Sequence, residues 1–297
     1  MSYHTRLLTS HPMFEFTTLF CTIDDFFQKN EAIYWQYLKQ ENPKIRQRSG
    51  VLCLSEIIFI AVWYKNSQIH NLKAFYGMIQ RFYAKLFKAL PSYQRIVYLI
   101  NQHQLALQAL HISLASNAQT TCAWVDSTTL PVCKNQRIQR HKSLKQIATR
   151  GKSSMGWFYG CKLHVLVDAQ GQFIQTRLSN GHTPDIKILP KLAQGYIGKI
   201  FGDRGYISEN LKDKLGTQGI ELITYHRKNM RRVELSPEDE IMLRQRNKIE
   251  TIFSLLKQQY NLVSSRHRSI SGYFAGIYAS LCAYQICHQN KPQFTTM

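Results

Sequence analysis

The chain has 297 residues, of which 44% are hydrophobic and 12% aromatic. This composition supports one substantial core with a smaller second domain, and it excludes both a disulfide-stapled miniprotein and a disordered chain. The 38 Lys and Arg residues against 18 Asp and Glu residues give a formal charge of +20, so the expected partner is nucleic acid or an anionic membrane surface.

The most apolar stretches do not predict a membrane span. Residues 51–64 contain Glu56, and residues 271–288 are interrupted by glycine and glutamine, whereas a span needs ~20 predominantly apolar residues in succession. Residues 1–20 contain no apolar segment followed by a small-residue cleavage site, so we expect no export. The seven cysteines are scattered and form no C-x-x-C pair, which is typical of free thiols in a reducing cytoplasm rather than of a zinc site.

The first part of the chain, residues 14–115, is predicted to be helical. Apolar residues recur over residues 74–90 at four-residue spacing with lysine and arginine between them, which is typical of an amphipathic helix. Pro91 is expected to end this helix, because proline cannot continue its hydrogen-bond pattern. We therefore predict an all-α N-terminal domain over residues 1–115.

From residue 121 onward the pattern favours strands, because short segments rich in β-branched residues are bounded by Gly, Pro, Asn or Asp. The predicted strands are residues 121–132, 160–168, 173–178, 199–203 and 220–225, and the predicted helices are residues 185–194, 208–218 and 237–260. This order predicts an α/β domain over residues 120–290, in which a mixed sheet is flanked by helices.

Three acidic residues stand where folding does not require an acid. Asp126 interrupts an apolar strand, Asp203 ends a strand beside a glycine, and Glu250 lies within the long helix. Burying an unpaired carboxylate is costly, so the two strand acids are expected to face a cleft. Ordinary alternatives stay open: a turn or cap for Asp126 and a helix cap for Asp203. Glu250 could equally form a surface ion network with Arg246 and Lys257.

Other polar residues near these acids have simpler interpretations. Asp168 is expected in the turn of a hairpin. Asp185 is expected to cap the helix that follows it, although Asp185 and His182 could also lie near the site.

Carboxylates from two neighbouring strands and from a helix packed across them can hold two divalent cations. Two cations about 4 Å apart activate one oxygen and stabilise the departing oxygen in an in-line displacement at phosphorus. Oxygen ligands favour Mg²⁺ or Mn²⁺. Asp126, Asp203 and Glu250 are residues of the right type and order to converge around two such ions, with the alternatives above still open.

The order of three short blocks is the most specific observation. WVDST at residues 124–128, FGDRGY at residues 201–206 and the pattern R-x3-E-x6-K at residues 246–257 resemble the signature blocks of DDE transposases of bacterial insertion sequences. The resemblance covers roughly residues 120–290 and implies a ribonuclease-H-like catalytic domain.

The resemblance also implies roles for individual residues. The implied metal ligands and catalytic residues are Asp126, Asp203 and Glu250. Arg246 and Lys257 match the basic residues of the third block, which implies contact with phosphate near the transposon end. The chain departs from the family at Leu243, where many members have a tyrosine linked to hairpin-type end processing.

A basic insertion over residues 134–157 follows the first acid. No acidic residue occurs between Ser127 and Val167, and seven basic side chains add +7 over residues 134–152. We expect a mobile arm that contacts phosphate, with a merely solvated loop as the alternative. The aromatic run at residues 157–159 is either core packing or a base-stacking platform. The predicted DNA-binding residues are Lys134, Arg137, Arg140, Lys142, Lys145, Arg150, Lys152, Arg204, Arg246 and Lys257.

Together these features predict a DNA transposase that catalyses metal-dependent cleavage at transposon ends and strand transfer into target DNA. The expected partners are double-stranded DNA, as terminal inverted repeats and target, and further copies of the chain in a homodimer or higher synaptic multimer. The helical domain and basic clusters at residues 227–232 and 266–268 are expected to bind DNA as well. The expected location is cytoplasmic and nucleoid-associated. Two alternatives stay open: a catalytically silent DNA-binding protein derived from a transposase, and a metal-dependent nuclease without strand transfer.

Overall fold

The structure is a computed structural model that describes residues 12–45, 47, 50–115, 120–154, 156–225, 234–263 and 267–289. The chain divides into two compact units. The helical unit runs to Leu114 and also contains Gln259–Leu262 and the segment from Ser271 onward, while the sheet unit contains Ala115–Gln258 and Val263–Ile270. The C-terminal helix, which the predicted boundary near residue 290 assigned to the sheet, thus groups with the helical unit.

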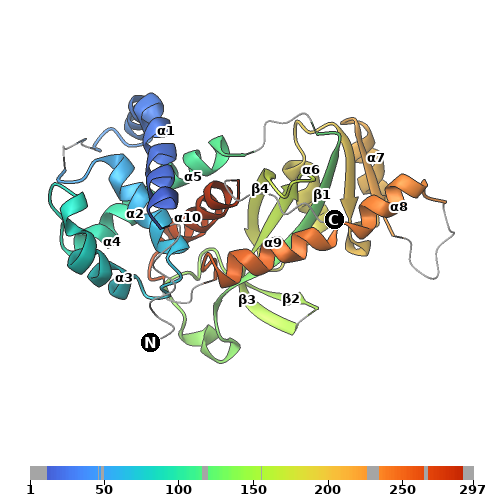
Figure 1. The fold of residues 1–297 in the computed structure, drawn as a ribbon. Helices are drawn as coiled ribbons and strands as arrows, with labels where there is room; N and C mark the ends of the chain where they lie inside the picture. The colour runs from blue at the N-terminus through green and yellow to red at the C-terminus, as the bar shows by residue number, and fades with distance from the viewer. Residues whose placement is uncertain are drawn as a thin grey trace, which may run out of the picture. The chain divides into compact units, whose positions relative to one another are not determined.

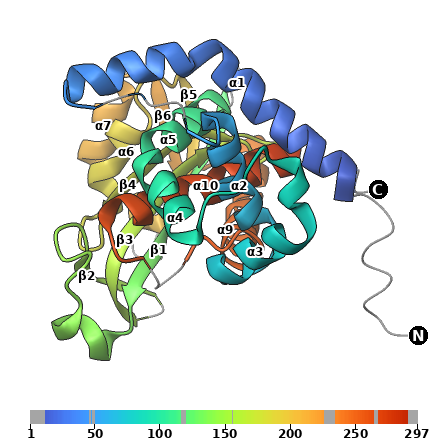
Figure 2. The same ribbon diagram turned by 90° about the vertical axis from the view of Figure 1, so that its left-hand side faces the viewer.

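The helical unit is built around two helices that are apolar on nearly all sides. Its α-helices are α1 (Pro12–Glu41), α2 (Leu54–Asn66), α3 (Leu72–Met78), α4 (Tyr93–Gln102), α5 (Gln104–Ser113) and α10 (Ile270–Gln289), and Figure 2 shows them. Helices α2 and α10 consist largely of buried residues, as expected of helices without a polar face. They account for the two apolar runs of the sequence, and no helix among the described residues is long and apolar enough to cross a membrane.

The segment between α3 and α4 differs from the single amphipathic helix predicted over residues 74–90. A π-helical turn at Ile79–Tyr83 and a 3₁₀ turn at Ala84–Leu86 follow α3. A π turn inserts an extra residue and rotates the following side chains. Phe82 is therefore 69% exposed instead of joining the apolar face.

The sheet unit contains a six-stranded mixed sheet with helices on both faces (Figure 1). Its strands are β1 (Cys122–Cys133), β2 (Thr149–Ser153), β3 (Gly156–Val167), β4 (Phe173–Asn180), β5 (Gly198–Gly202) and β6 (Ile220–Thr224). The strand order is β2-β3-β1-β5-β6, and β4 pairs with β3. β1 is antiparallel to β3 and parallel to β5, so the sheet is mixed as predicted.

Side chains of β1 point alternately to the two faces of the sheet, and each face is covered by different helices. Ala123 and Val125 belong to a buried cluster with apolar residues of α6 (Asp185–Leu192) and α7 (Glu209–Gly216). Trp124 points to the other face, where its indole Nε1 donates to Met242 O of α8 (Pro237–Arg244) at 2.8 Å. Helix α9 (Asn247–Gln258) also contacts β1. Asp126, two positions after Trp124, shares the face of α8 and α9.

Candidate catalytic site

The first two predicted acids lie at the same end of two neighbouring parallel strands: Asp126 is on β1, and Asp203 directly follows β5. Trp124 of β1 pairs with Phe201 of β5, and Asp126 and Asp203 each follow one of these partners by two residues. Because side chains alternate along a strand, the two acids point to the same side of the sheet. Asp203 caps a short 3₁₀ turn by accepting a hydrogen bond from Arg204 N at 2.6 Å. Helix α7, whose capping was the alternative role for Asp203, is capped by Ser208.

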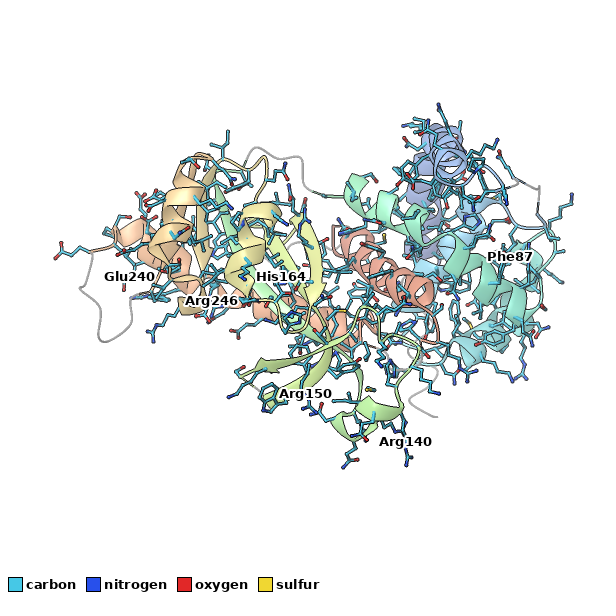
Figure 3. All side chains as sticks on the ribbon, turned by 180° about the vertical axis from the view of Figure 1, so that it is seen from behind. Phe87, Arg140, Arg150, His164, Glu240 and Arg246 are labelled. Carbon is cyan, nitrogen blue, oxygen red and sulfur yellow. The ribbon has the colours of Figure 1, made fainter. Side chains whose placement is uncertain are left out.

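Arg246 lies between the first and the third predicted acid (labelled in Figure 3). Its Nη1 donates to Asp126 Oδ2 at 3.0 Å, and its Nη2 lies 3.7 Å from Glu250 Oε1. The Asp126 and Arg246 side chains are mostly buried, whereas the Glu250 side chain is 64% exposed. The guanidinium thus connects Asp126 and Glu250.

Arg246 reaches Asp126 because the predicted helix over residues 237–260 is interrupted. Gln245 ends α8, and Arg246 lies in the turn before α9 begins at Asn247. The Arg246 N–H donates to Leu243 O at 3.3 Å, a bond typical of a tight turn. Glu250 and Lys257 both lie on α9, beyond this break.

Helix α8 is attached to the sheet at two points. The indole of Trp124 donates to the carbonyl of Met242, and Lys199 Nζ lies 2.8 Å from Asp239 Oδ1. The hydrogen bond from Lys199 holds the pKa of Asp239 below its usual value. These contacts, one in the first turn and one further along, fix α8, which leads into Arg246.

The pKa of Asp126 is raised to about 6, first of all by burial and further by the charges of Asp203 and Asp185. The hydrogen bond from Ser127 N and the charge of Arg246 lower it, but they do not offset the burial. A nearby cation therefore stabilises the ionised form of Asp126.

Asp185 belongs to the surroundings of Asp126, and the prediction that it caps α6 is wrong. Its Oδ2 accepts a hydrogen bond from Ser127 Oγ at 2.8 Å, and its Oδ1 accepts one from Lys162 Nζ at 2.9 Å. His164, opposite Ser127 on β3, lies 3.9 Å from the same carboxylate. Burial lowers the pKa of His164 to about 4, so this imidazole is neutral at pH 7. Lys162 and Ser127 could not be recognised in the sequence because their common partner is far away along the chain.

Tyr206 contributes a buried hydroxyl close enough to the acids for their charges to affect it. Its side chain is 2% exposed, and among the described residues its Oη has no hydrogen-bond partner. Burial raises its pKa well above the usual value, and the charges of Asp185, Asp126 and Asp203 raise it further. The sequence indicated this tyrosine only as the last residue of the FGDRGY block.

The basic insertion is folded, in contrast to the mobile arm that the sequence predicted. It forms a 3₁₀ segment at Asn135–Arg140 and strand β2, and two of its apolar residues, Leu144 and Ala148, are buried. Asn135 Nδ2 donates to Trp157 O at 2.8 Å, which joins the segment to β3. Figure 3 shows Arg140 and Arg150 on this part of the sheet unit. The predicted DNA-binding residues Lys134, Arg137, Arg140, Lys142, Lys145, Arg150 and Lys152 are all exposed.

The remaining predicted residues lie in different surroundings. Arg204 is exposed beside Asp203, and Lys257 is half-buried, which lowers its pKa. Asp168 Oδ1 accepts hydrogen bonds from the backbone N–H groups of residues 170 and 172, which confirms its turn role. His182 contacts Thr149 Oγ1 at 3.0 Å, on β2. Residues 227–232 and Arg266 lie outside the described residues.

The predicted metal ligands do not form a compact group in the described structure. Within the described part of the chain, no three His, Cys, Asp or Glu side chains converge closely enough to hold an ion. Asp126 and Asp203 are near enough for one charge to affect the other, while Glu250 reaches Asp126 through Arg246. The assignment of Asp126, Asp203 and Glu250 as the metal ligands stays a prediction.

The comparisons with known proteins identify the class. Residues 116–270, more than half of the chain, match the family model of the transposase DDE domain. The chain therefore belongs to this family, as the three sequence blocks predicted. No curated protein sequence matches the chain.

One solved transposase structure shares the fold of this chain. A piggyBac transposase synaptic complex with hairpin DNA aligns with a TM-score of 0.53 and 11% identity, covering 94% of this chain and 75% of that one. A Mos1 transposase paired-end complex with the left transposon end aligns at 12% identity, with a TM-score of 0.23 over 86% of this chain and 85% of that one. The piggyBac alignment shows a shared fold, and the structure confirms the predicted class, a mixed α/β sheet with flanking helices that is preceded in the chain by a helical region.

Proposed function

We propose that this transposase cleaves DNA at the ends of its element and joins the released 3′ end to target DNA. One observation carries the proposal: Asp126 on β1 and Asp203, directly after β5, each lie two residues beyond the paired residues Trp124 and Phe201, at the same end of two neighbouring parallel strands. A carboxylate pair at one end of a sheet, with a third acid on the adjacent helix, suits chemistry at a phosphodiester.

The chemistry of the residues at this site suits a divalent cation, although their side chains do not converge into a closed set of ligands in the described structure. Carboxylate oxygens are the ligands that Mg²⁺ and Mn²⁺ prefer. The raised pKa of Asp126 means that its negative charge lacks full compensation from Arg246 alone. We propose that Asp126, Asp203 and Glu250 hold two such ions. Bound there, the ions would stabilise the charge that builds on the attacking and departing oxygens.

The reaction needs no covalent protein–DNA intermediate. In the first step a water oxygen attacks phosphorus at the element's end, the bond from phosphorus to the 3′ oxygen breaks, and that oxygen takes up a proton. In the second step this 3′ hydroxyl oxygen attacks a target phosphorus and gives up its proton. A new ester bond forms, and a target 3′ oxygen leaves and is protonated. The number of phosphodiester bonds is unchanged by the second step, so no energy source is required.

The basic side chains of the chain would hold the DNA. We propose that Arg246 and Lys257 contact phosphate near the element's end, and that the exposed cations of the basic insertion extend this contact along the backbone. Cleavage of two ends implies a dimer or a higher synaptic assembly, consistent with the synaptic organisation of the structurally similar piggyBac complex. The helical unit is then available to recognise the terminal repeats.

The test is incubation of a labelled element end with Mg²⁺ and a target plasmid. We expect joined product from the unmodified chain. Asp126→Asn, Asp203→Asn and Glu250→Gln should each lower cleavage and joining by about 10³-fold or more while end binding persists. Asp213→Asn, on the exposed face of α7, is the matched control and should retain activity. Cleavage without joining would indicate a nuclease, and binding without cleavage would indicate a silent regulator. Normal chemistry in one of the three variants would remove that residue from the site.

A further inference from the structure

The β2–β3 hairpin of the basic insertion has two unlike faces. Lys152 pairs with Trp157 and Arg150 pairs with Tyr159, so these four side chains lie on one face. On the opposite face Phe158 is buried, and Gly151 packs so closely on the backbone of Gly181 that a Cβ would not fit. The second face therefore packs on the rest of the sheet unit, whereas on the first face only Tyr159 is buried.

Trp157 stands out on the first face. Its side chain is 59% exposed, whereas Phe158 and Tyr159 beside it are buried. The aromatic run at residues 157–159, for which the sequence left core packing and base stacking open, thus divides between the two roles. An exposed indole leaves a large apolar surface in water, which favours a partner that covers it.

The neighbours of Trp157 indicate the chemistry of that partner. Lys152 Nζ lies 5.8 Å from the centroid of the indole ring, and Arg150 is exposed on the same face. Asn135 Nδ2 fixes the backbone at Trp157, and the exposed Arg137 and Arg140 follow Asn135 in the chain. A flat aromatic surface set among cations matches a nucleobase attached to its phosphates.

We propose that Trp157 stacks against an unpaired nucleobase of bound DNA, with Arg150 and Lys152 on the adjacent phosphates. The indole is presented on a paired strand, so little conformational entropy is lost on stacking. Stacking does not depend on base identity, because every base has a π face.

The sheet register gives the distance of this contact from the candidate catalytic site. Asp126 pairs with Val165, which lies eight residues beyond Trp157 on β3. At ~3.3 Å per residue this separation is roughly 26 Å. It corresponds to about 8 nucleotides at the rise of duplex DNA, which is ~3.4 Å per nucleotide of one strand. This step alone rests on the proposed function, because it takes Asp126 as the position of the reacting phosphate.

Binding of an oligothymidylate of about 12 nucleotides, measured by fluorescence anisotropy in metal-free buffer, tests the stacking. Trp157→Ala should weaken binding about 5- to 100-fold without changing the salt dependence, and Trp157→Phe should retain most of the affinity. Lys152→Ala should instead lower the slope of log K against log salt by about 0.7. Ile197→Ala removes another exposed apolar side chain of the sheet unit, 73% exposed, and serves as the matched control.

Two results from binding and sedimentation would overturn the proposal, and a third comes from a labelled element end. One is an affinity of Trp157→Ala equal to that of Ile197→Ala. The other is a dimer of the unmodified chain, seen by sedimentation, that Trp157→Ala alone dissolves, because the indole would then cover a second copy of the chain. An element end carrying 2-aminopurine should show its largest Trp157-dependent fluorescence change about 8 nucleotides from the cleaved bond. Joined product without a Trp157-dependent fluorescence change would overturn the stacking and leave the proposed transposition intact. A fluorescence change without joined product would overturn the proposed transposition and leave the stacking intact.

Discussion

Buried ionisable groups meet different partners in the two units. In the helical unit His103 contacts a tyrosine hydroxyl, His111 contacts the side-chain oxygen of a glutamine, and Lys65 donates to a backbone carbonyl. Burial lowers the pKa of both histidines to about 4 and that of Lys65 to about 7. These groups have uncharged partners, and they serve packing.

In the sheet unit, by contrast, full charges are kept together at one end of the sheet. Asp185 pairs with Lys162, and Asp126 pairs with Arg246, with side-chain exposures of 14% to 29% across the four residues. Ionised pairs at this depth contribute little net stability, because desolvation offsets their attraction. The sheet unit thus retains two ion pairs that add little to its stability. Such groups are expected where a protein performs a reaction.

The largest expected effect on stability comes from Gly160→Ala in the sheet unit. A Cβ at this position would overlap the backbone carbonyl of Leu130 on the neighbouring strand, and neither strand can yield without breaking its pairing. We expect a loss of about 3 kcal/mol in unfolding free energy, measured by urea denaturation. An unchanged midpoint would show that the sheet is less tightly packed than the helical unit.

A smaller loss is expected from Lys162→Met, which leaves the Asp185 carboxylate without its cation. We expect about 2 kcal/mol, because the pair is only partly buried. The double variant Lys162→Met/Asp185→Leu should recover part of the loss by removing the second charge. Lys187→Met, an exposed change on α6, is the control. If Lys162→Met and Lys187→Met change the unfolding free energy equally, the Lys162–Asp185 pair does not contribute to stability.

Lys65→Met tests how the buried lysine of the helical unit makes stability depend on pH. The folded pKa of Lys65 is about 7, below its ordinary value of 10.5, so between these values the unfolded chain binds more protons. Stability of the unmodified chain should therefore rise with pH across this window, by at most about 1.4 kcal/mol per pH unit. Lys65→Met should lose that rise in thermal unfolding at pH 7 to 9. Lys73→Met, exposed on α3, should keep it, and equal pH dependence of the two variants would contradict the effect.

The smallest effect has the opposite sign. Gly77 lies inside α3 of the helical unit, and a Cβ there would meet no atom within 4 Å. Gly77→Ala should therefore stabilise the chain by about 0.5–1 kcal/mol, seen as a higher thermal midpoint. A lower midpoint would indicate that the π turn after α3 depends on the flexibility of this glycine.

Local pattern was sufficient to predict the strands that carry the acids. Alternation and β-branched residues located β1 and β5, and the order of acids along them led to the class of protein. Strand β2 could not be predicted, because Thr149–Ser153 is polar and becomes a strand only by pairing with β3. The break at Arg246 was missed for a similar reason, since it depends on how α8 is attached to the sheet.

The partners of Asp126 were harder to predict than Asp126 itself. Asp185 stands at a helix start, where a cap is the ordinary interpretation, and only the folded chain brings Ser127 and Lys162 to it. The roles of Asp126, Asp203 and Glu250 in the reaction stay predictions until the variants are measured.

Strand β1 supports several parts of the candidate site within four consecutive residues. Trp124 holds α8, Asp126 binds Arg246, and Ser127 binds Asp185. A small displacement of this one strand would misalign all of these groups simultaneously. Damage to β1 should consequently disrupt the whole candidate site in a single event, with no intermediate stage in which part of it stays intact.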